Sequence, residues 1–417
     1  MIRVSNNKTL KLPAIKDIRN YAIGLIVCAS SFTGIQSSQA QTLNKQAIPT
    51  IDHNIDKNNI SDYLKFNKIF QSLNIDQQQK SLEILSHLAE TNPRTVNNFF
   101  KLFTPNDRSN FVRINRSVLF DRDQEGNSLI DNLHKQAKSN IFFDIGEHKN
   151  KLISDTLELL SNPDQYSQGS YGICSQVTKC FYLATRNPSE FVNLINLLTI
   201  RGENYTLKHP DGSVILLKRN KSTPLDPDAN FAISLASASF LEYVNSRFQK
   251  YDMTTDTNYQ NFKAQEFNFN EELDKHLLEA VTKTEYANLD LNFLKQLGTE
   301  NTINILNGIL KHANQNNIQV EIDILTDSVD HSAHRLLAIA YNQKTKQFIL
   351  KNSWGENPKG DVSFFQRPNN NIGIINVDSK DFFKKCYKIN VPKFYRTQDF
   401  GFNSILVYDH ETRSGNN

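Results

Sequence analysis

The chain has 417 residues, of which 38% are hydrophobic, and its 47 basic and 44 acidic side chains give a formal net charge of +3. This composition is typical of a packed globular protein and excludes a disordered chain. The near balance of charge provides no basic surface, so we expect no nucleic-acid partner. The four cysteines form no C-x-x-C pair, and we therefore expect no disulfide scaffold, no metal site and no cofactor.

The first 40 residues have the layout of a secretory signal. Five basic side chains precede a short apolar run, and the small residues Ser38 and Ala40 follow it. The apolar run is shorter than the about 20 residues that a membrane-spanning helix needs. We therefore expect cleavage after Ala40, a secreted or periplasmic protein, and no stable membrane insertion afterwards. A buried N-terminal helix or a weak anchor is the alternative interpretation.

Helical patterns dominate the first part of the chain after a polar linker at residues 41–58. Apolar residues recur mostly at three- and four-residue steps from Ile60 to Ile114, with interruptions at Pro93 and Pro105. Residues 59–147 are therefore predicted to form an N-terminal helical region. An amphipathic helix is predicted at residues 151–161, and residues 175–200 are again helical, with a helix start at Pro188.

Strand patterns become frequent in the last third of the chain. Before them, the turn sequence at residues 209–212 separates YTLK from SVILL and predicts a hairpin. Residues 229–249 and 270–313 are mainly helical. Short apolar segments, several rich in β-branched residues, then predict strands at residues 318–325, 334–341, 347–352 and 372–377. Helices first and strands last predict an α+β fold.

The segment most informative about chemistry is QGSYGIC, which ends at Cys174 and leads into the helical pattern SQVTKCFYLA. A cysteine at the first position of a helix has its thiolate stabilised by the positive end of the helix dipole. The glycines before it allow a substrate to approach the backbone closely. The side-chain amide of Gln168 and the backbone N–H of Cys174 could together form an oxyanion hole.

The last third of the chain supplies a base for such a thiol. His334 opens one predicted strand and Asn352 ends the next, so two adjacent antiparallel strands can bring these side chains together. The amide oxygen of Asn352 would then orient the imidazole and select its tautomer. Trp354 is the only tryptophan in the chain, and it would shield this hydrogen bond from water.

These segments resemble the three sequence blocks of the papain-like cysteine peptidases. QGSYGIC matches the block Q-G-x-C-G-x-C-W in its glutamine, both glycines and final cysteine, HRLLAIAY matches the histidine block, and NSWG is present unchanged. The resemblance implies Cys174 as nucleophile, His334 as base and acid, and Asn352 as the orienting group. Gln168 would hold the oxyanion, and Trp354 would support the site.

The resemblance also implies a fold and a reaction. The fold would have a helical lobe and an antiparallel, β-barrel-like lobe at residues 148–410, with the N-terminal helical region as an addition. The substrate would be a protein or peptide, attacked at a peptide or isopeptide bond by a Cys174 thiolate paired with the His334 imidazolium, through a thioester. The N-terminal helical region is either an inhibitory pro-segment or an integral helical lobe, and we favour the second because the helix at residues 151–161 runs nearly into the active-site loop.

The chain departs from the family pattern around both reactive residues. Tyr171 stands where the family has a disulfide cysteine, and Ser175 stands where an aromatic residue follows the nucleophile. Arg335, beside the histidine, is also unusual. The 160 residues that separate Cys174 from His334 exceed the usual spacing of about 130–150. These differences indicate a distant, bacterial-type relative.

Several alternatives remain open. His331 is a rival to His334 as the base, although its spacing of ten residues to Tyr341 is too long for the family pattern. Cys180 and Cys386 are either a disulfide pair or, as we expect, two separate buried thiols. The same site could serve an amide-directed deamidase or a transglutaminase-type acyltransferase. A catalytically inactive binding module is the alternative from another class.

Overall fold

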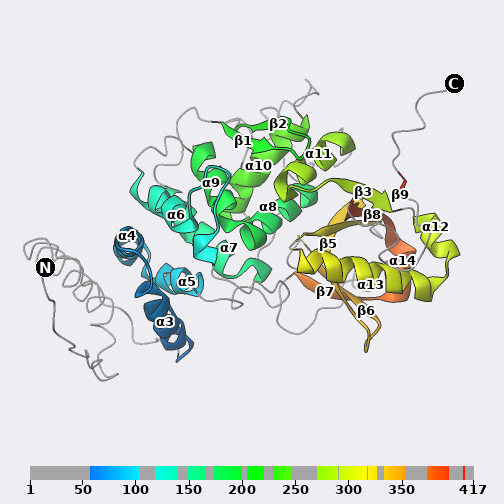
Figure 1. The fold of residues 1–417 in the computed structure, drawn as a ribbon, viewed down its shortest axis with the longest axis horizontal. Helices are drawn as coiled ribbons and strands as arrows, with labels where there is room; N and C mark the ends of the chain where they lie inside the picture. The colour runs from blue at the N-terminus through cyan, green and yellow to red at the C-terminus, as the bar shows by residue number, and fades with distance from the viewer. Residues whose placement is uncertain are drawn as a thin grey trace, which may run out of the picture.

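Helices dominate the computed structural model up to residue 285, and every strand of its main sheet comes later (Figure 1). The predicted α+β class is therefore confirmed. The structure describes residues 57–103, 118–139, 148–165, 173–199, 204–219, 225, 229–245, 270–289, 291–316, 318–325, 333–352, 373–393 and 407–408. The expected signal at residues 1–40 lies outside these ranges. Within them, no helix combines the length and the apolar character needed to cross a membrane.

The predicted N-terminal helical region contains short helices that local side chains begin and end. Asn74 and Ser128 each form a capping box with the backbone three residues later, which satisfies N–H groups that the first turn leaves unpaired. One helix ends at Thr91 with Asn92 as its C-cap, and Pro93 follows, as predicted. The first helix begins at Lys57, two residues inside the expected linker. The elements are α3 (Lys57–Phe70), α4 (Ile75–Thr91), η2 (Pro93–Thr95), α5 (Val96–Lys101), η3 (Val118–Phe120) and α6 (Leu129–Lys138).

The middle of the chain forms longer and more deeply buried helices. The predicted helical segment at residues 175–200 is two helices, because Pro188 begins the second of them and Asn187 accepts a hydrogen bond from the backbone N–H of Glu190 at 3.2 Å. The predicted hairpin is present, with Tyr205 paired with Leu217. The elements are α7 (Lys149–Ser161), η5 (Pro163–Gln165), α8 (Cys174–Arg186), α9 (Pro188–Thr199), β1 (Tyr205–Lys208), β2 (Val214–Leu217), α10 (Phe231–Asn245) and α11 (Glu271–Thr282).

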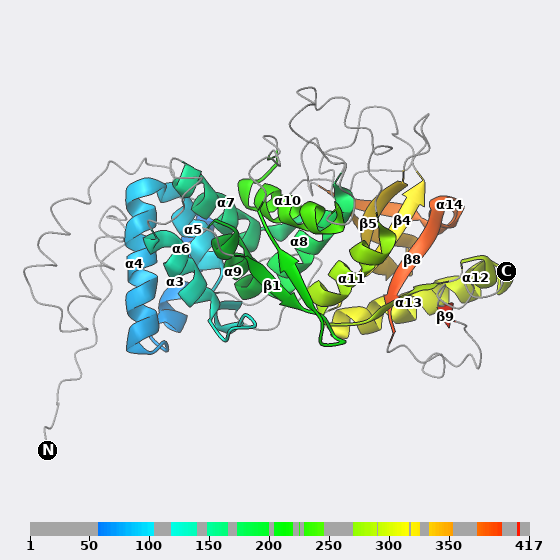
Figure 2. The ribbon, with the colours of Figure 1, turned by 90° about the horizontal axis from the view of Figure 1, so that it is seen from above.

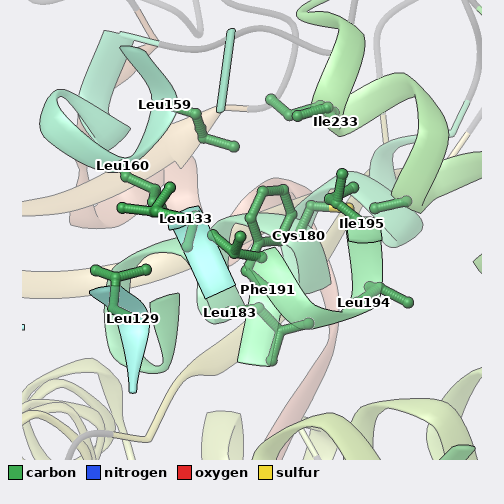
Figure 3. Close-up of a cluster of buried hydrophobic side chains, with 14 of the residues drawn as sticks. Leu129, Leu133, Leu159, Leu160, Cys180, Leu183, Phe191, Leu194, Ile195 and Ile233 are labelled. Atoms are coloured by element: carbon green, nitrogen blue, oxygen red, sulfur yellow. The ribbon is translucent and has the colours of Figure 1, made fainter. Parts of the chain in front are cut away.

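One apolar core joins these helices. Figure 3 shows its centre, where Phe191, Leu183 and Cys180 of α8 and α9 lie beside leucines of α6 and α7. The same core extends from Phe66 of α3 to Val281 of α11. Truncating one such buried leucine to alanine typically costs about 2–5 kcal/mol. The N-terminal helices therefore pack as part of the same helical body as α8.

The main sheet is antiparallel and open among the described strands. Its order is β7-β6-β5-β4-β8-β3-β9, and neither β7 nor β9 has a second neighbour. The barrel-like lobe that the resemblance implied is therefore wrong for these residues, because closure requires the two edge strands to pair. The strands are β3 (Tyr286–Leu289), β4 (Val320–Leu325), β5 (Ala333–Asn342), β6 (Gln347–Asn352), β7 (Ile374–Asp378), β8 (Cys386–Pro392) and β9 (Val407–Tyr408).

Helices cover both faces of the sheet, and two cores result. The core on one face joins the sheet to α12 (Leu291–Gln296), α13 (Thr299–Gln315) and α14 (Ser379–Lys385). On the other face α8 packs against β5, and Leu337 of β5 belongs to the helical core. Figures 1 and 2 show the helical body and the sheet side by side, with α8 and α11 at their junction.

Three strands were missed by the sequence patterns, β3, β8 and the two-residue β9. The segment at residues 270–313 was predicted to be mainly helical, but Tyr286–Leu289 forms β3 between two helices. The seven residues of β8 were not predicted as a strand at all. The missed strands pair with one another, because β3 has Tyr286 opposite Pro392 of β8 and Leu289 opposite Val407 of β9. A four-residue strand has too little periodicity to be recognised locally, and it is stabilised here by a partner about 100 residues away.

We expect Gly373→Ala to destabilise the contact between β6 and β7. Gly373 has φ +80°, and an added Cβ would lie 2.9 Å from the carbonyl oxygen of Asn352 and 2.5 Å from Nζ of Lys351. Gly126 is the matched control, because its φ is +88° and an added Cβ would have no neighbour within 4 Å. Gly126→Ala should cost about 1–2 kcal/mol for the backbone conformation alone, and Gly373→Ala should cost more in urea unfolding. Equal costs would contradict this account of Gly373.

Candidate active site

Cys174 is the first residue of α8, as the sequence predicted. The helix begins after Ile173, which makes no side-chain cap hydrogen bond, so the positive end of the helix is not neutralised by a capping side chain. The thiol is half-buried. Its Sγ accepts a hydrogen bond from the backbone N–H of Arg335 at 3.4 Å, which attaches the start of α8 to the start of β5.

His334 and Asn352 form the predicted pair. Nε2 of His334 lies 2.8 Å from Oδ1 of Asn352, and both side chains are buried. The register explains the contact, because β5 and β6 are antiparallel and Leu336 lies opposite Asn352, which makes His334 its diagonal neighbour. An amide oxygen can only accept a hydrogen bond, so Nε2 carries the proton and Nδ1 is the basic nitrogen of the ring.

Strand alternation separates Cys174 from this pair. Arg335 points toward α8, where its guanidinium contacts the hydroxyl of Ser175 at 2.8 Å. Successive side chains of a strand lie on opposite faces, so His334 and Asn352 lie on the face covered by α13. The structure therefore brings His334 to Asn352, and it joins Cys174 to the backbone beside His334 and not to the imidazole.

Burial keeps the thiol and the imidazole neutral. It raises the pKa of Cys174 above its ordinary value, although the backbone N–H and the guanidinium of Arg335 act to lower it. Burial also lowers the pKa of His334 to about 4, against the opposing effects of Asn352 and Asp323. The resting site thus holds a thiol and a neutral imidazole at pH 7. The thiolate–imidazolium pair that the resemblance implied does not describe this state, because desolvation penalises both charges.

A buried cluster of charged residues lies directly beside Cys174. At its centre is Arg335, which donates to both oxygens of Asp323, at 2.6 and 2.8 Å, and to a carboxylate oxygen of Asp274. Glu321 lies 3.3 Å from the same guanidinium. The second cation is Lys179 of α8, 2.8 Å from Asp274 and fully buried. This cluster joins four elements, α8, α11, β4 and β5.

Ser175 links the cluster to the nucleophile. Its hydroxyl donates to Asp274 at 2.7 Å and accepts from both Lys179 and Arg335 at 2.8 Å. Ser175 and Arg335 were the two departures that the sequence showed beside the reactive residues. They bond to each other in the structure. Sequence reasoning identified them as unusual but missed the cluster, because its carboxylates come from distant segments without a motif.

The cluster is close to electrically neutral. Burial acts to raise the pKa of Asp274, but Lys179 and Arg335 outweigh it and lower this pKa to about 2. Burial raises the pKa of Glu321 despite the same two cations. A proton on Glu321 would leave two cations and two carboxylates. Equal numbers of positive and negative charges reduce the desolvation cost of burying these ions. Without such pairing, the desolvation cost would exceed the attraction between the ions.

Five further residues were named by the sequence analysis. Gln168, Trp354 and His331 fall outside the described residues, so the oxyanion, shielding and rival-base assignments remain predictions. Cys180 and Cys386 are both buried free thiols, which confirms the expectation of two separate thiols over a disulfide.

Comparison with known proteins assigns the chain to no family. No family model matches it, and no curated protein and no solved structure matches it. Its function therefore has to be inferred from its own residues.

We expect His334 to make the protein less stable in mild acid. Its pKa is about 4 in the folded protein and 6.5 when unperturbed, so the unfolded chain binds a proton between these values and the folded chain does not. Stability conferred by the neutral ring is present above pH 6.5 and is lost as the pH falls to 4, by on the order of 3 kcal/mol. Urea unfolding of wild type and His334→Gln between pH 4 and 6.5 measures the difference in their free energies of unfolding. The other histidines are present in both proteins, so their contributions cancel in this difference. Parallel pH profiles would contradict it.

Arg335→Met should destabilise the protein by about 3–5 kcal/mol, because it leaves Asp323 and Asp274 buried without their cation. The double variant Arg335→Met with Asp323→Leu should recover part of this loss, since it removes one unpaired carboxylate. Lys388→Met is the matched control, because its ion pair with Glu271 is solvent-exposed at the carboxylate and 2.7 Å long. The control should cost at most about 1 kcal/mol in urea unfolding. A control as costly as Arg335→Met would disprove the role assigned to the buried cluster.

Proposed function

We propose that the protein is an exported, papain-like cysteine hydrolase that cleaves peptide or isopeptide bonds through a thioester at Cys174. One observation carries the proposal. A thiol at the start of a helix accepts the N–H of Arg335 at 3.4 Å, and the residue before Arg335 forms a 2.8 Å histidine–asparagine pair. Cys174 thus lies beside the strand that carries His334, and Cys174, His334 and Asn352 have the residue types and chain order of a thiol hydrolase.

The two-part fold supports the proposal in a coarser way. Cys174 begins a helix of the helical body, and His334 and Asn352 lie on strands of the antiparallel sheet. A papain-like fold likewise places its nucleophile on a helix and its other catalytic residues on a sheet. The junction of the two cores is where a substrate carbonyl could contact the first-turn N–H groups of α8. Gln168 would contribute the second donor of the oxyanion hole.

The reaction starts from the neutral pair. His334 takes the thiol proton on Nδ1 as Sγ attacks the carbonyl carbon, so the S–C bond forms while the carbonyl oxygen becomes an oxyanion held by the N–H of Cys174. Asn352 keeps Nε2 protonated throughout. Before attack, Sγ must lose its hydrogen bond from the backbone N–H of Arg335 and form one with Nδ1 of His334. His334 is the second residue of β5, so a rotation at the strand end on substrate binding would supply this exchange.

The acyl-enzyme then forms and is hydrolysed. The oxyanion collapses, the C–N bond breaks, and His334 gives its proton to the leaving amine. A water molecule then loses a proton to His334 and attacks the thioester. The acid product leaves and Cys174 recovers its proton. Replacement of this water by an amine would give the transglutaminase-type alternative, and release of ammonia from a side-chain amide would give the deamidase.

A catalytically inactive binding module is the second candidate, and strand alternation favours it. His334 and Asn352 lie on the face of the sheet away from α8, and the thiol of Cys174 is bonded to backbone. A pKa of about 4 for His334 also makes the imidazole a weak base. The two candidates differ in whether a substrate-like molecule can bring the thiol and the imidazole together.

Covalent labelling separates these functions. For a hydrolase, a peptide electrophile should modify Cys174 faster than iodoacetamide does, when each rate is divided by that reagent's rate with free cysteine. The reason is that the bound peptide would bring the thiol and the imidazole together. His334→Gln should remove this advantage and lower hydrolysis of a peptide library by about 10²–10⁴-fold. Mass spectrometry identifies both the labelled residue and the products.

The chain supplies its own controls for this experiment. Cys180 and Cys386 are buried, and burial raises the pKa of both thiols, so they should stay unlabelled in the folded protein. Cys174→Ala should abolish labelling. Equal relative rates for the two reagents would favour the binding module and overturn the hydrolase. Labelling with ammonia release or cross-linking, but no cleavage, would favour the acyltransferase alternatives.

A further inference from the structure

A compact group of metal-binding side chains lies at the hairpin β1–β2, away from Cys174. The hairpin turn contains His209 and Asp211, and His276 of α11 lies beside it, with the rings of the two histidines 4.0 Å apart between centroids. One donor atom from each of these three residues lies within 4.8 Å of the other two. Figure 1 shows β1, β2, α10 and α11 grouped together on one side of the helical body.

The ring of His209 is oriented by a carboxylate on its far side. Nε2 lies 3.0 Å from an oxygen of Glu279, whose other oxygen accepts the backbone N–H of Tyr286 at 2.7 Å. Both side chains are buried. A carboxylate on one ring nitrogen holds the proton there and leaves the other nitrogen as the more basic donor to a metal. Nδ1 of His209 is the ring nitrogen that faces Asp211 and the rest of the group.

His276 is oriented in the same way. The hydroxyl of Tyr243 lies 2.8 Å from its Nδ1, which leaves Nε2 on the side of the hairpin, where the hydroxyl of Ser213 lies at 3.2 Å. Each histidine thus has one nitrogen held by an outer partner and one nitrogen directed at the hairpin turn. Such outer partners are the usual companions of metal-bound histidines.

Asp211 completes the set with an oxygen donor. Its Oδ1 lies 2.8 Å from Nδ1 of His209 and accepts the backbone N–H of Ser213 at 2.7 Å. The backbone N–H of Asp211 donates a hydrogen bond to Nδ1 of His209 at 3.2 Å, and a metal ion at Nδ1 would replace this bond. A carboxylate thus faces each ring nitrogen of His209, Glu279 at Nε2 and Asp211 at Nδ1. A cation bound at Nδ1 would take the place of a ring proton and contact the same Asp211 oxygen.

We propose that His209, Asp211 and His276 bind one divalent transition-metal ion of the zinc type. Two imidazoles and one carboxylate are typical zinc ligands, whereas calcium and magnesium take oxygen ligands. Three protein ligands leave a fourth position for water, which the exposed side of Asp211 allows. The ion would cross-link the hairpin to α11, the helix that also carries Asp274 of the buried charge cluster. This site does not depend on the proposed hydrolase activity.

The sequence expectation of no metal site rested on the cysteines. The ligands proposed here are histidines and an aspartate, and 67 residues separate His209 from His276. The only local feature, His-Pro-Asp-Gly, was explained by the hairpin turn. The second histidine reaches the turn only because α11 packs against β1.

The test measures zinc binding to the full, untagged chain. All proteins carry Cys174→Ala, so that this thiol cannot bind the ion, and a chromophoric chelator competes for Zn²⁺ after stripping with EDTA. The parent should bind one Zn²⁺ per chain and melt at a higher temperature with zinc than without it. Asp211→Asn and His276→Asn should each weaken binding by about tenfold or more, and Glu279→Gln should weaken it by about 10–100-fold.

His312→Asn is the matched control, because His312 is also a half-buried histidine on a helix, α13, and lies outside the group. It should bind zinc as the parent does. Asp211 is exposed in a turn, so Asp211→Asn decides the question if His276→Asn fails to fold in EDTA. A parent that binds no zinc, or an Asp211→Asn protein that binds it unchanged, would overturn the proposal.

Discussion

The junction between the helical body and the sheet depends on keeping buried charges paired. Arg335 extends from β5 between Asp323 of the neighbouring strand and Asp274 of α11, and Lys179 of α8 meets Asp274 from the other side. Removing one member leaves its partner as an unpaired ion in a low-dielectric interior. The free energy of unfolding then falls far more than it does when an exposed ion pair is removed. Four elements must therefore keep one relative position. Cys174 begins one of these elements, so the same pairs set where its thiol lies.

This constraint explains why the surroundings of Cys174 differ from those of a papain-like peptidase. A tryptophan at position 175, as in the family block, has no acceptor for Lys179 and Arg335, whereas the serine hydroxyl accepts from both and donates to Asp274. The two departures in the sequence are thus one structural change. Its electrostatic consequence is a nearly balanced cluster beside the thiol, which supplies little net charge to stabilise a thiolate. The raised pKa of Cys174 and the lowered pKa of His334 agree with that balance.

Patterns carried by neighbouring residues were predicted well, and pairings between distant residues were not. Asn187–Pro188 divides two helices, and His209 to Gly212 turns a hairpin, because these residues restrict their own backbone. The strands that hold His334 and Asn352 were predicted from their short apolar runs. β3 was missed because four residues carry little periodicity, and β8 because its partners are far away in sequence. The barrel-like closure failed for a related reason, since edge pairing is a property of whole sheets.

The amino-acid sequence by itself determined the α+β order of elements, the helix that begins at Cys174, and the pairing of His334 with Asn352, because each follows from local preferences or from the register of two adjacent strands. The tertiary structure decided what these residues face. Strand alternation directed Arg335 toward α8 and His334 away from it, and burial left the thiol and the imidazole neutral. The packing of α11 against β1 also brought His276 to the hairpin turn. The direction in which a side chain points, its desolvation and its contacts with distant residues arise only when the elements pack together. No local sequence pattern therefore predicts them.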